Sequence, residues 1–115
     1  MGLSLSVIKK RQDFLALRSG VRANSPGFLL AARPNKAAGE GARIGLTVTK
    51  KIGGAVVRNR IRRRLRAAVR EIFPQFAHAG MDYVLIARKA AYNRNYALLL
   101  DDMKRALLRL ARDTK

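Results

Sequence analysis

The segment from Lys50 to Arg70 combines a helical apolar pattern with an extreme excess of positive charge. Nine of its positions are Lys or Arg, and no acidic residue occurs between Glu40 and Glu71. Apolar residues recur through it and just beyond it at the spacing of one helix face: Val57, Ile61, Leu65, Ala68, Val69 and Ile72. One side of this helix must therefore pack on a core, while the other side is almost entirely guanidinium.

The positive charge of this helix is unfavourable within the chain itself. Arginines four residues apart, such as Arg58/Arg62 and Arg62/Arg66, repel each other by roughly 0.2–0.5 kcal/mol per pair in a helix. A merely solvated face is the alternative interpretation, but solvated faces ordinarily mix both signs of charge. We therefore expect a partner dense in phosphate, and we interpret the segment as an RNA-docking helix.

Composition indicates one folded domain with a nucleic-acid partner. The chain has 115 residues, is 49% hydrophobic and carries a net charge of +18, so residues 1–115 are expected to form a single RNA-binding domain. Residues 1–70 hold 17 of the 25 basic residues, which predicts one strongly cationic surface. A membrane partner is not expected, because no long apolar helix accompanies the charge. The absence of cysteine suits a cytoplasmic location.

The flanking segments predict an α+β fold. Residues 1–7 are expected to be a frayed terminus, and residues 11–18 a short helix that Gly20 stops. Residues 21–33 read as extended chain interrupted by Ser25-Pro26-Gly27, residues 43–49 as a half-buried strand, and residues 83–88 as an inner strand. Pro74 is expected to end the basic helix, and a last helix is expected over about 95–112. The predicted order is α-β-β-β-α-β-α, a two-layer sandwich with a four-stranded sheet and three helices.

The residues around Gly53-Gly54 are suited to binding phosphate. Lys50 and Lys51 precede the glycine turn, and backbone N–H groups at a helix start point toward a bound anion. Guanidinium groups bind phosphate oxygens through two parallel hydrogen bonds. Asn59 is short, polar and uncharged, which suits a hydrogen bond to a base edge or a sugar.

This stretch closely resembles the signature of the protein subunit of bacterial ribonuclease P. The matching sequence, from Lys50 to Arg66, is Lys-Lys-Ile-Gly-Gly-Ala-Val-Val-Arg-Asn-Arg-Ile-Arg-Arg-Arg-Leu-Arg, and weaker similarity extends across most of the chain. The resemblance implies the family's α+β sandwich, with a left-handed βαβ crossover around the basic helix, against the general right-handed rule. The RNA-binding residues expected from the motif and its helix are Lys50, Lys51, Arg58, Asn59, Arg60, Arg62, Arg63, Arg66 and Arg70.

The resemblance also implies a function. The protein would bind the large catalytic RNA and the 5′ leader of precursor tRNA, and the RNA would hydrolyse the phosphodiester with Mg²⁺. The protein would be an accessory subunit of this endoribonuclease, inactive alone, monomeric when free and without a tightly held metal. The alternative is a ribosomal or RNA-chaperone protein without a role in tRNA processing. A stand-alone nuclease is disfavoured because no carboxylate cluster is visible in the sequence.

In the family, the leader cleft lies between the first helix and the sheet and presents aromatic residues. Phe14 and Phe28 match, with core packing as the alternative for both, and bases stacked on them would contribute roughly 1–3 kcal/mol each. Two departures weaken the match: Leu17 and Arg18 stand where many members have a second Phe, and Ala31 stands where many have Tyr. The expected leader-cleft residues are Phe14, Leu17, Arg18, Phe28, Arg88 and Lys89.

The remaining titratable residues are expected to have structural rather than catalytic roles. The only histidine, His78, is expected in the loop after the basic helix, and Asp82 is expected to cap the turn into a strand. Asp101 and Asp102 are adjacent on the last helix, so their side chains point about 100° apart and are poorly placed to hold one metal ion. Arg64, at the edge of the buried stripe, is expected to extend toward solvent.

Overall fold

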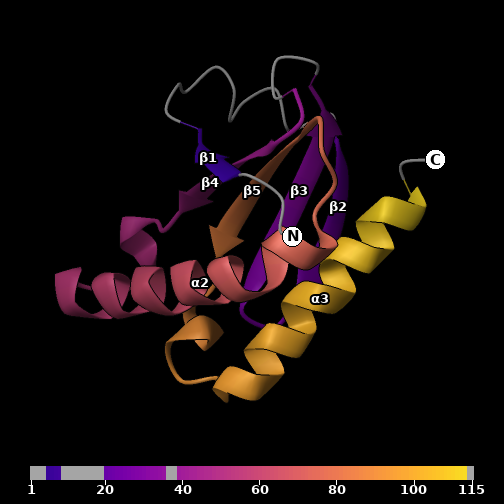
Figure 1. Cartoon of the computed structure of the whole chain (residues 1–115). Helices are drawn as coiled ribbons and strands as arrows, with labels where there is room; N and C mark the ends of the chain where they lie inside the picture. The colour runs from indigo at the N-terminus through magenta and orange to yellow at the C-terminus, as the bar shows by residue number, and fades with distance from the viewer. Residues whose placement is uncertain (1–4, 9–19, 36–38, 114–115) are drawn as a thin grey trace.

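The computed structural model describes residues 5–8, 20–35 and 39–113. In this part of the chain, five strands form one mixed sheet, and two long helices pack on one of its faces (Figure 1). The strands are β1 (Leu5–Val7), β2 (Val21–Ser25), β3 (Phe28–Pro34), β4 (Ala42–Thr47) and β5 (Met81–Ala87). The helices are α2 (Ala55–Phe76) and α3 (Tyr96–Asp113), with short 3-10 turns η3 (Lys50–Ile52) and η4 (Lys89–Tyr92). The α+β class is confirmed, whereas the helix expected over residues 11–18 lies outside the described residues.

The sheet has one strand more than the sequence predicted. Its order is β1-β4-β5-β3-β2, and Leu5–Val7 pair in parallel with β4, Leu5 opposite Ala42 and Val7 opposite Ile44. The predictions of a four-stranded sheet and of a frayed segment through residue 7 are therefore wrong. A segment of three residues is too short to show the alternation of apolar and polar side chains that indicates a strand. β1 is instead stabilised by pairing with β4, which is far along the chain.

The inner strands follow the sequence pattern. Ser25-Pro26-Gly27 interrupts the extended segment as expected, because Ser25 and Phe28 are the last paired residues of the β2–β3 hairpin. β5 lies between β4 and β3, parallel to the first and antiparallel to the second, which confirms that it is an inner strand. α2 connects the parallel neighbours β4 and β5 as a βαβ crossover, whose handedness stays a prediction.

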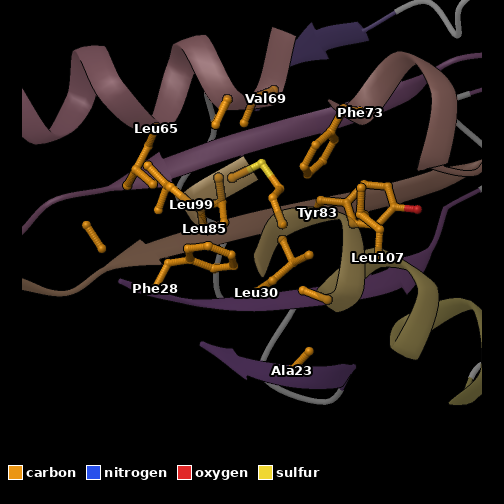
Figure 2. Packing of buried hydrophobic residues seen from close by; sticks show 14 of the residues in the cluster. Ala23, Phe28, Leu30, Leu65, Val69, Phe73, Tyr83, Leu85, Leu99 and Leu107 are labelled. Atoms are coloured by element: carbon orange, nitrogen blue, oxygen red, sulfur yellow. The ribbon is translucent and has the colours of Figure 1, made fainter. Parts of the chain in front are cut away.

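The core lies between the sheet and the two helices (Figure 2). The predicted apolar face of α2 is confirmed at Ile61, Leu65, Ala68 and Val69, which are buried. Val57 and Ile72 are only partly buried against the core, and Phe73, which was not predicted, is fully buried. They meet Leu99, Met103 and Leu107 of α3 and Phe28, Leu30, Tyr83 and Leu85 of the sheet. The rings of Phe73 and Tyr83 pack edge to face with centroids 5.2 Å apart. This packing fixes the rotation of α2 about its axis, and with it the direction in which each arginine points.

Pro74 does not end α2, contrary to the prediction. The helix continues to Phe76, and the N–H of Ala77 still donates to the carbonyl of Phe73 at 2.9 Å. A proline lacks the N–H that would bond the preceding turn, which costs most in a helix interior. Here only the last turn is affected, and Phe73 and the partly buried Phe76 hold that turn on the core.

Candidate nucleic-acid interface

Positively charged groups are concentrated at the N-terminal end of α2 and in the turn that precedes it. Lys50 and Lys51 are exposed in η3, and Gly54, the N-cap of α2, has no side chain with which to cap the helix. Arg58 folds back over this turn, its Nε donating to the carbonyl of Gly53 at 3.2 Å. A Cβ at Gly53 would lie 3.2 Å from the side chain of Val57, so a larger residue here would require Val57 to shift by a few tenths of an ångström. The two lysines therefore lie close in sequence to the positive end of the helix dipole.

One half of the basic side of α2 forms a shallow cationic groove, which we call the basic groove. It has a volume of ≈340 Å³ and is lined by Asn59, Arg62, Arg63, Arg66 and Arg70. Asn59 accepts a 3.0 Å hydrogen bond from Arg62 through its Oδ1, so two of the lining side chains are joined to each other. Among the ion pairs between described residues, none involves an arginine of α2. The groove thus presents four guanidinium groups without a carboxylate to neutralise them.

Arg60 and Arg64 have a different role. Arg60 donates through Nε to the carbonyl of Tyr92 at 2.9 Å, and its guanidinium lies 4.9 Å from the centre of the Tyr92 ring. Arg64 donates to the same carbonyl at 3.1 Å and also to that of Arg94. Both arginines brace α2 against the connection between η4 and α3. Arg64 is partly exposed, as expected, but its guanidinium is held by backbone carbonyls. The acceptors lie about thirty residues away in sequence, and no local pattern marks them.

The connection between η4 and α3 is itself held to α3. Arg94 donates to Asp102 with contacts of 2.6 and 3.2 Å, and this hydrogen bonding raises the pKa of Arg94 above its ordinary value. Asp101 pairs instead with Arg105 one turn further along α3, at 3.0 Å. Asp101 and Asp102 therefore neutralise nearby arginines and leave the basic groove uncompensated.

The sheet face that α2 and α3 do not cover carries a buried ion pair. Arg33, Asp82 and Arg43 are neighbours across β3, β5 and β4. Asp82 is fully buried and accepts hydrogen bonds from Nε and a terminal nitrogen of Arg43 at 2.7 and 2.6 Å, and from Asn35 at 2.8 Å. The prediction that Asp82 caps a turn is wrong, because its carboxylate instead joins β5 to Arg43 of β4 and to Asn35, which directly follows β3.

The pKa of Asp82 reflects this environment. Burial on its own raises the pKa, but hydrogen bonds from Arg43 and Asn35 and the charges of Arg43 and Arg33 more than offset that effect. The pKa therefore lies below its ordinary value. Asp82 is ionised at neutral pH and has a structural partner for each oxygen.

The same uncovered face includes part of the expected leader cleft. Ala31 and Val84 are opposed on β3 and β5 and form a small buried cluster with Ile8. Exposed Arg88 donates to Asn24 Oδ1 at 2.6 Å and to the carbonyl of Ser25 at 3.3 Å, and Lys89 is exposed in η4.

Phe28 does not belong to that cleft. It is 0% exposed and packs in the helix-covered core (Figure 2). Ala31 belongs to the separate buried cluster on the other face. Side chains alternate between the faces of a strand, so residues 28 and 31 cannot share one face. Phe28 as a leader-cleft residue is therefore wrong, and the strand alternation already visible in the sequence could have shown it. Phe14, Leu17 and Arg18 lie outside the described residues.

Comparison with known proteins identifies the family. A family model described as Ribonuclease P matches residues 4–111. The chain belongs to the ribonuclease P protein family. It is 48% identical over 110 residues to the ribonuclease P protein component of Erythrobacter litoralis, covering 96% of this chain and 88% of the relative. The corresponding protein of Paramagnetospirillum magneticum is 46% identical over 114 residues, covering 96% and 86%.

A solved structure of the Staphylococcus aureus RNase P protein has the same fold. It superposes with a TM-score of 0.75 at 28% sequence identity, covering 90% of this chain and 93% of that one. The chain is thus the protein component of the ribonuclease P ribonucleoprotein, an endoribonuclease that processes tRNA, and the ribonuclease P RNA is its partner.

The described part of the chain contains no cluster of side chains suited to holding a metal ion. Within the described ranges, no three His, Cys, Asp or Glu side chains come close enough to hold a metal ion. His78 is exposed beyond the end of α2, and its backbone N–H donates to the buried hydroxyl of Tyr83 at 2.9 Å. Across the same residues, no helix has the length and apolar character needed to cross a bilayer.

Proposed function

We propose that this protein binds the catalytic RNA of ribonuclease P through the basic groove of α2. The single observation that carries the proposal is that four arginines and Asn59 line one groove without a carboxylate. Lys50, Lys51 and Arg58 extend the cationic surface to the helix start, where backbone N–H groups add to the attraction for phosphate. Arg60 contributes mainly by bracing α2, since backbone carbonyl and ring contacts already engage its guanidinium.

The 5′ leader of precursor tRNA is proposed to lie on the sheet face that α2 and α3 leave uncovered. Arg88 and Lys89 are exposed at one end of this face, and Ile86, which is 37% exposed, provides apolar surface beside them. Phe14, Leu17 and Arg18 are proposed to complete the cleft. Contacts of this kind tolerate different leader sequences, because they read phosphates and apolar base faces rather than base edges.

The RNA is proposed to hold the Mg²⁺ and perform the hydrolysis, while the protein raises affinity for substrate. A monomeric protein suffices for this role. The decisive experiment combines the purified protein with bacterial ribonuclease P RNA and precursor tRNA at low Mg²⁺ and measures release of the 5′ leader. A clear rise in cleavage over RNA alone is expected, with no cleavage by the protein alone. No rise over RNA alone would contradict the proposal.

Salt dependence tests the groove itself. If about five phosphates are neutralised, log affinity for the catalytic RNA should fall with log salt at a slope of roughly −4. Replacing Arg62→Ala together with Arg63→Ala should weaken binding and reduce the slope by roughly 1.5–2. The matched control, Arg105→Ala with Arg109→Ala on α3, removes the same charge and should leave the slope nearly unchanged. Equal changes in the two double variants would show that net charge, and not the groove, governs binding.

A further inference from the structure

An apolar pocket opens between α2 and the β1–β4 edge of the sheet. It has a volume of ≈340 Å³, at the small end of the range for ligand pockets. Its apolar lining comes from four elements: Leu5, Val7 and Ile8 at β1, Ile44 and Leu46 of β4, Val69 of α2 and Leu85 of β5. Val7 is 65% exposed although it lies on the helix-facing side of the sheet, opposite Ile44. The pocket is therefore an open hollow into which a small apolar group can enter from solvent.

Two arginines connect this pocket to the basic groove. Arg66 and Arg70 line the pocket on one side and the groove on the other. No carboxylate is among the residues that line either hollow. A ligand that fills both the pocket and the basic groove must carry an apolar group and an anionic group only a short distance apart. A nucleotide has this construction, since its base and its phosphate are separated only by the sugar.

We infer that the pocket receives one unstacked base of the RNA whose backbone lies in the basic groove, with a neighbouring phosphate on Arg66 and Arg70. The inference rests on the proposed function and adds a specific base site to it. Bases in duplex RNA are stacked and paired, whereas those in loops and bulges can turn outward into protein pockets. The apolar part of the lining is aliphatic and contains no aromatic ring, so the base is held by burial of its faces and not by stacking on a ring.

Filling the pocket tests the inference in the intact complex. Val7→Trp places a large ring at the pocket mouth, and Leu108→Trp, at an α3 position that is 51% exposed, is the matched control. Val7→Trp should weaken binding of the catalytic RNA by about tenfold, the usual scale of one base contact, and Leu108→Trp should not. The salt slope should stay unchanged in both, because neither variant alters a charge.

The outcomes separate the two proposals. If the wild-type protein does not bind the catalytic RNA in a salt-dependent manner, the proposed function fails. If the wild type binds but Val7→Trp binds equally well, the base site alone is overturned. Circular dichroism of Val7→Trp should match that of the wild type, since the substituted side chain is mostly exposed.

A second measurement does not depend on any variant. Methyl NMR signals of Leu5, Val7 and Leu46 are followed in the free protein with adenosine or uridine 5′-monophosphate, and separately with ribose 5-phosphate. The nucleotides should move these methyl signals, whereas ribose 5-phosphate should move only the side-chain N–H signals of the arginines. No methyl movement at millimolar nucleotide, or equal movement with ribose 5-phosphate, would overturn the base site. Movement with decanoate but not with nucleotide would assign the pocket to an anionic amphiphile instead.

Discussion

Replacing Asp82→Asn removes the buried carboxylate of the uncovered sheet face while keeping the shape of the side chain. Asp82 is fully buried, and its oxygens accept hydrogen bonds from Arg43 and Asn35. The amide of asparagine can accept through one oxygen only, and its nitrogen faces a donor where the carboxylate had an acceptor. The variant therefore loses the ion pair and places two donors against each other.

The magnitude follows from the burial of the two partners. Removing one member of a buried ion pair costs about 3–5 kcal/mol when the remaining charge cannot reach water. The Arg43 side chain is 22% exposed and can be partly hydrated, so a loss of about 2–3 kcal/mol is expected. With a urea m-value of about 2 kcal/mol/M, the unfolding midpoint should fall by roughly 1–1.5 M.

Urea unfolding followed by circular dichroism measures this loss, and Asp101→Asn is the matched control. The Asp101–Arg105 pair is exposed and one turn apart in a helix, so its removal should cost about 0.3–0.5 kcal/mol. The pKa of Asp82 in the folded state is lowered from 3.8. The contribution of the ionised carboxylate to the free energy of unfolding is therefore fully present above about pH 4 and is lost as pH falls through the folded-state pKa. The difference between wild type and Asp82→Asn should accordingly shrink below pH 4. Equal midpoints for the two variants at pH 7, or a gap that persists undiminished at low pH, would refute the reasoning.

Three further substitutions test other contacts, each by urea unfolding. Arg64→Ala removes hydrogen bonds to two backbone carbonyls and should lower the free energy of unfolding by about 1–3 kcal/mol. The control Arg63→Ala, at an exposed position, should change the free energy of unfolding by less than about 0.5 kcal/mol. Equal effects would contradict the division between bracing and groove arginines. Tyr83→Phe should cost about 1–2 kcal/mol because the N–H of His78 loses its acceptor, and no loss would indicate that water replaces the hydroxyl. Phe28→Ala should cost about 3–5 kcal/mol, and a variant of unchanged stability with weakened leader binding would instead support the cleft position.

The two faces of α2 could be predicted from the sequence because both signals are local. Helical spacing of Ile61, Leu65 and Val69 identifies the side that packs on the core, and the arginines occupy the rest of the circumference whatever the fold. The β2–β3 turn could also be predicted from a local signal, because Pro26 and Gly27 interrupt a strand through their own backbone geometry.

Only the tertiary structure decided what each arginine does. Arg60 and Arg62 are two residues apart and chemically identical, yet one donates to the carbonyl of Tyr92 and the other to Asn59 at the rim of an open groove. Tertiary pairing also made a strand of Leu5–Val7 and joined Arg43 to Asp82. The physical reason is that hydrogen bonds and ion pairs act over a few ångströms, between groups that only the assembled sheet and helices bring together. Periodicity along the chain determines which side of an element is apolar, but the partners of its polar side come from distant parts of the chain.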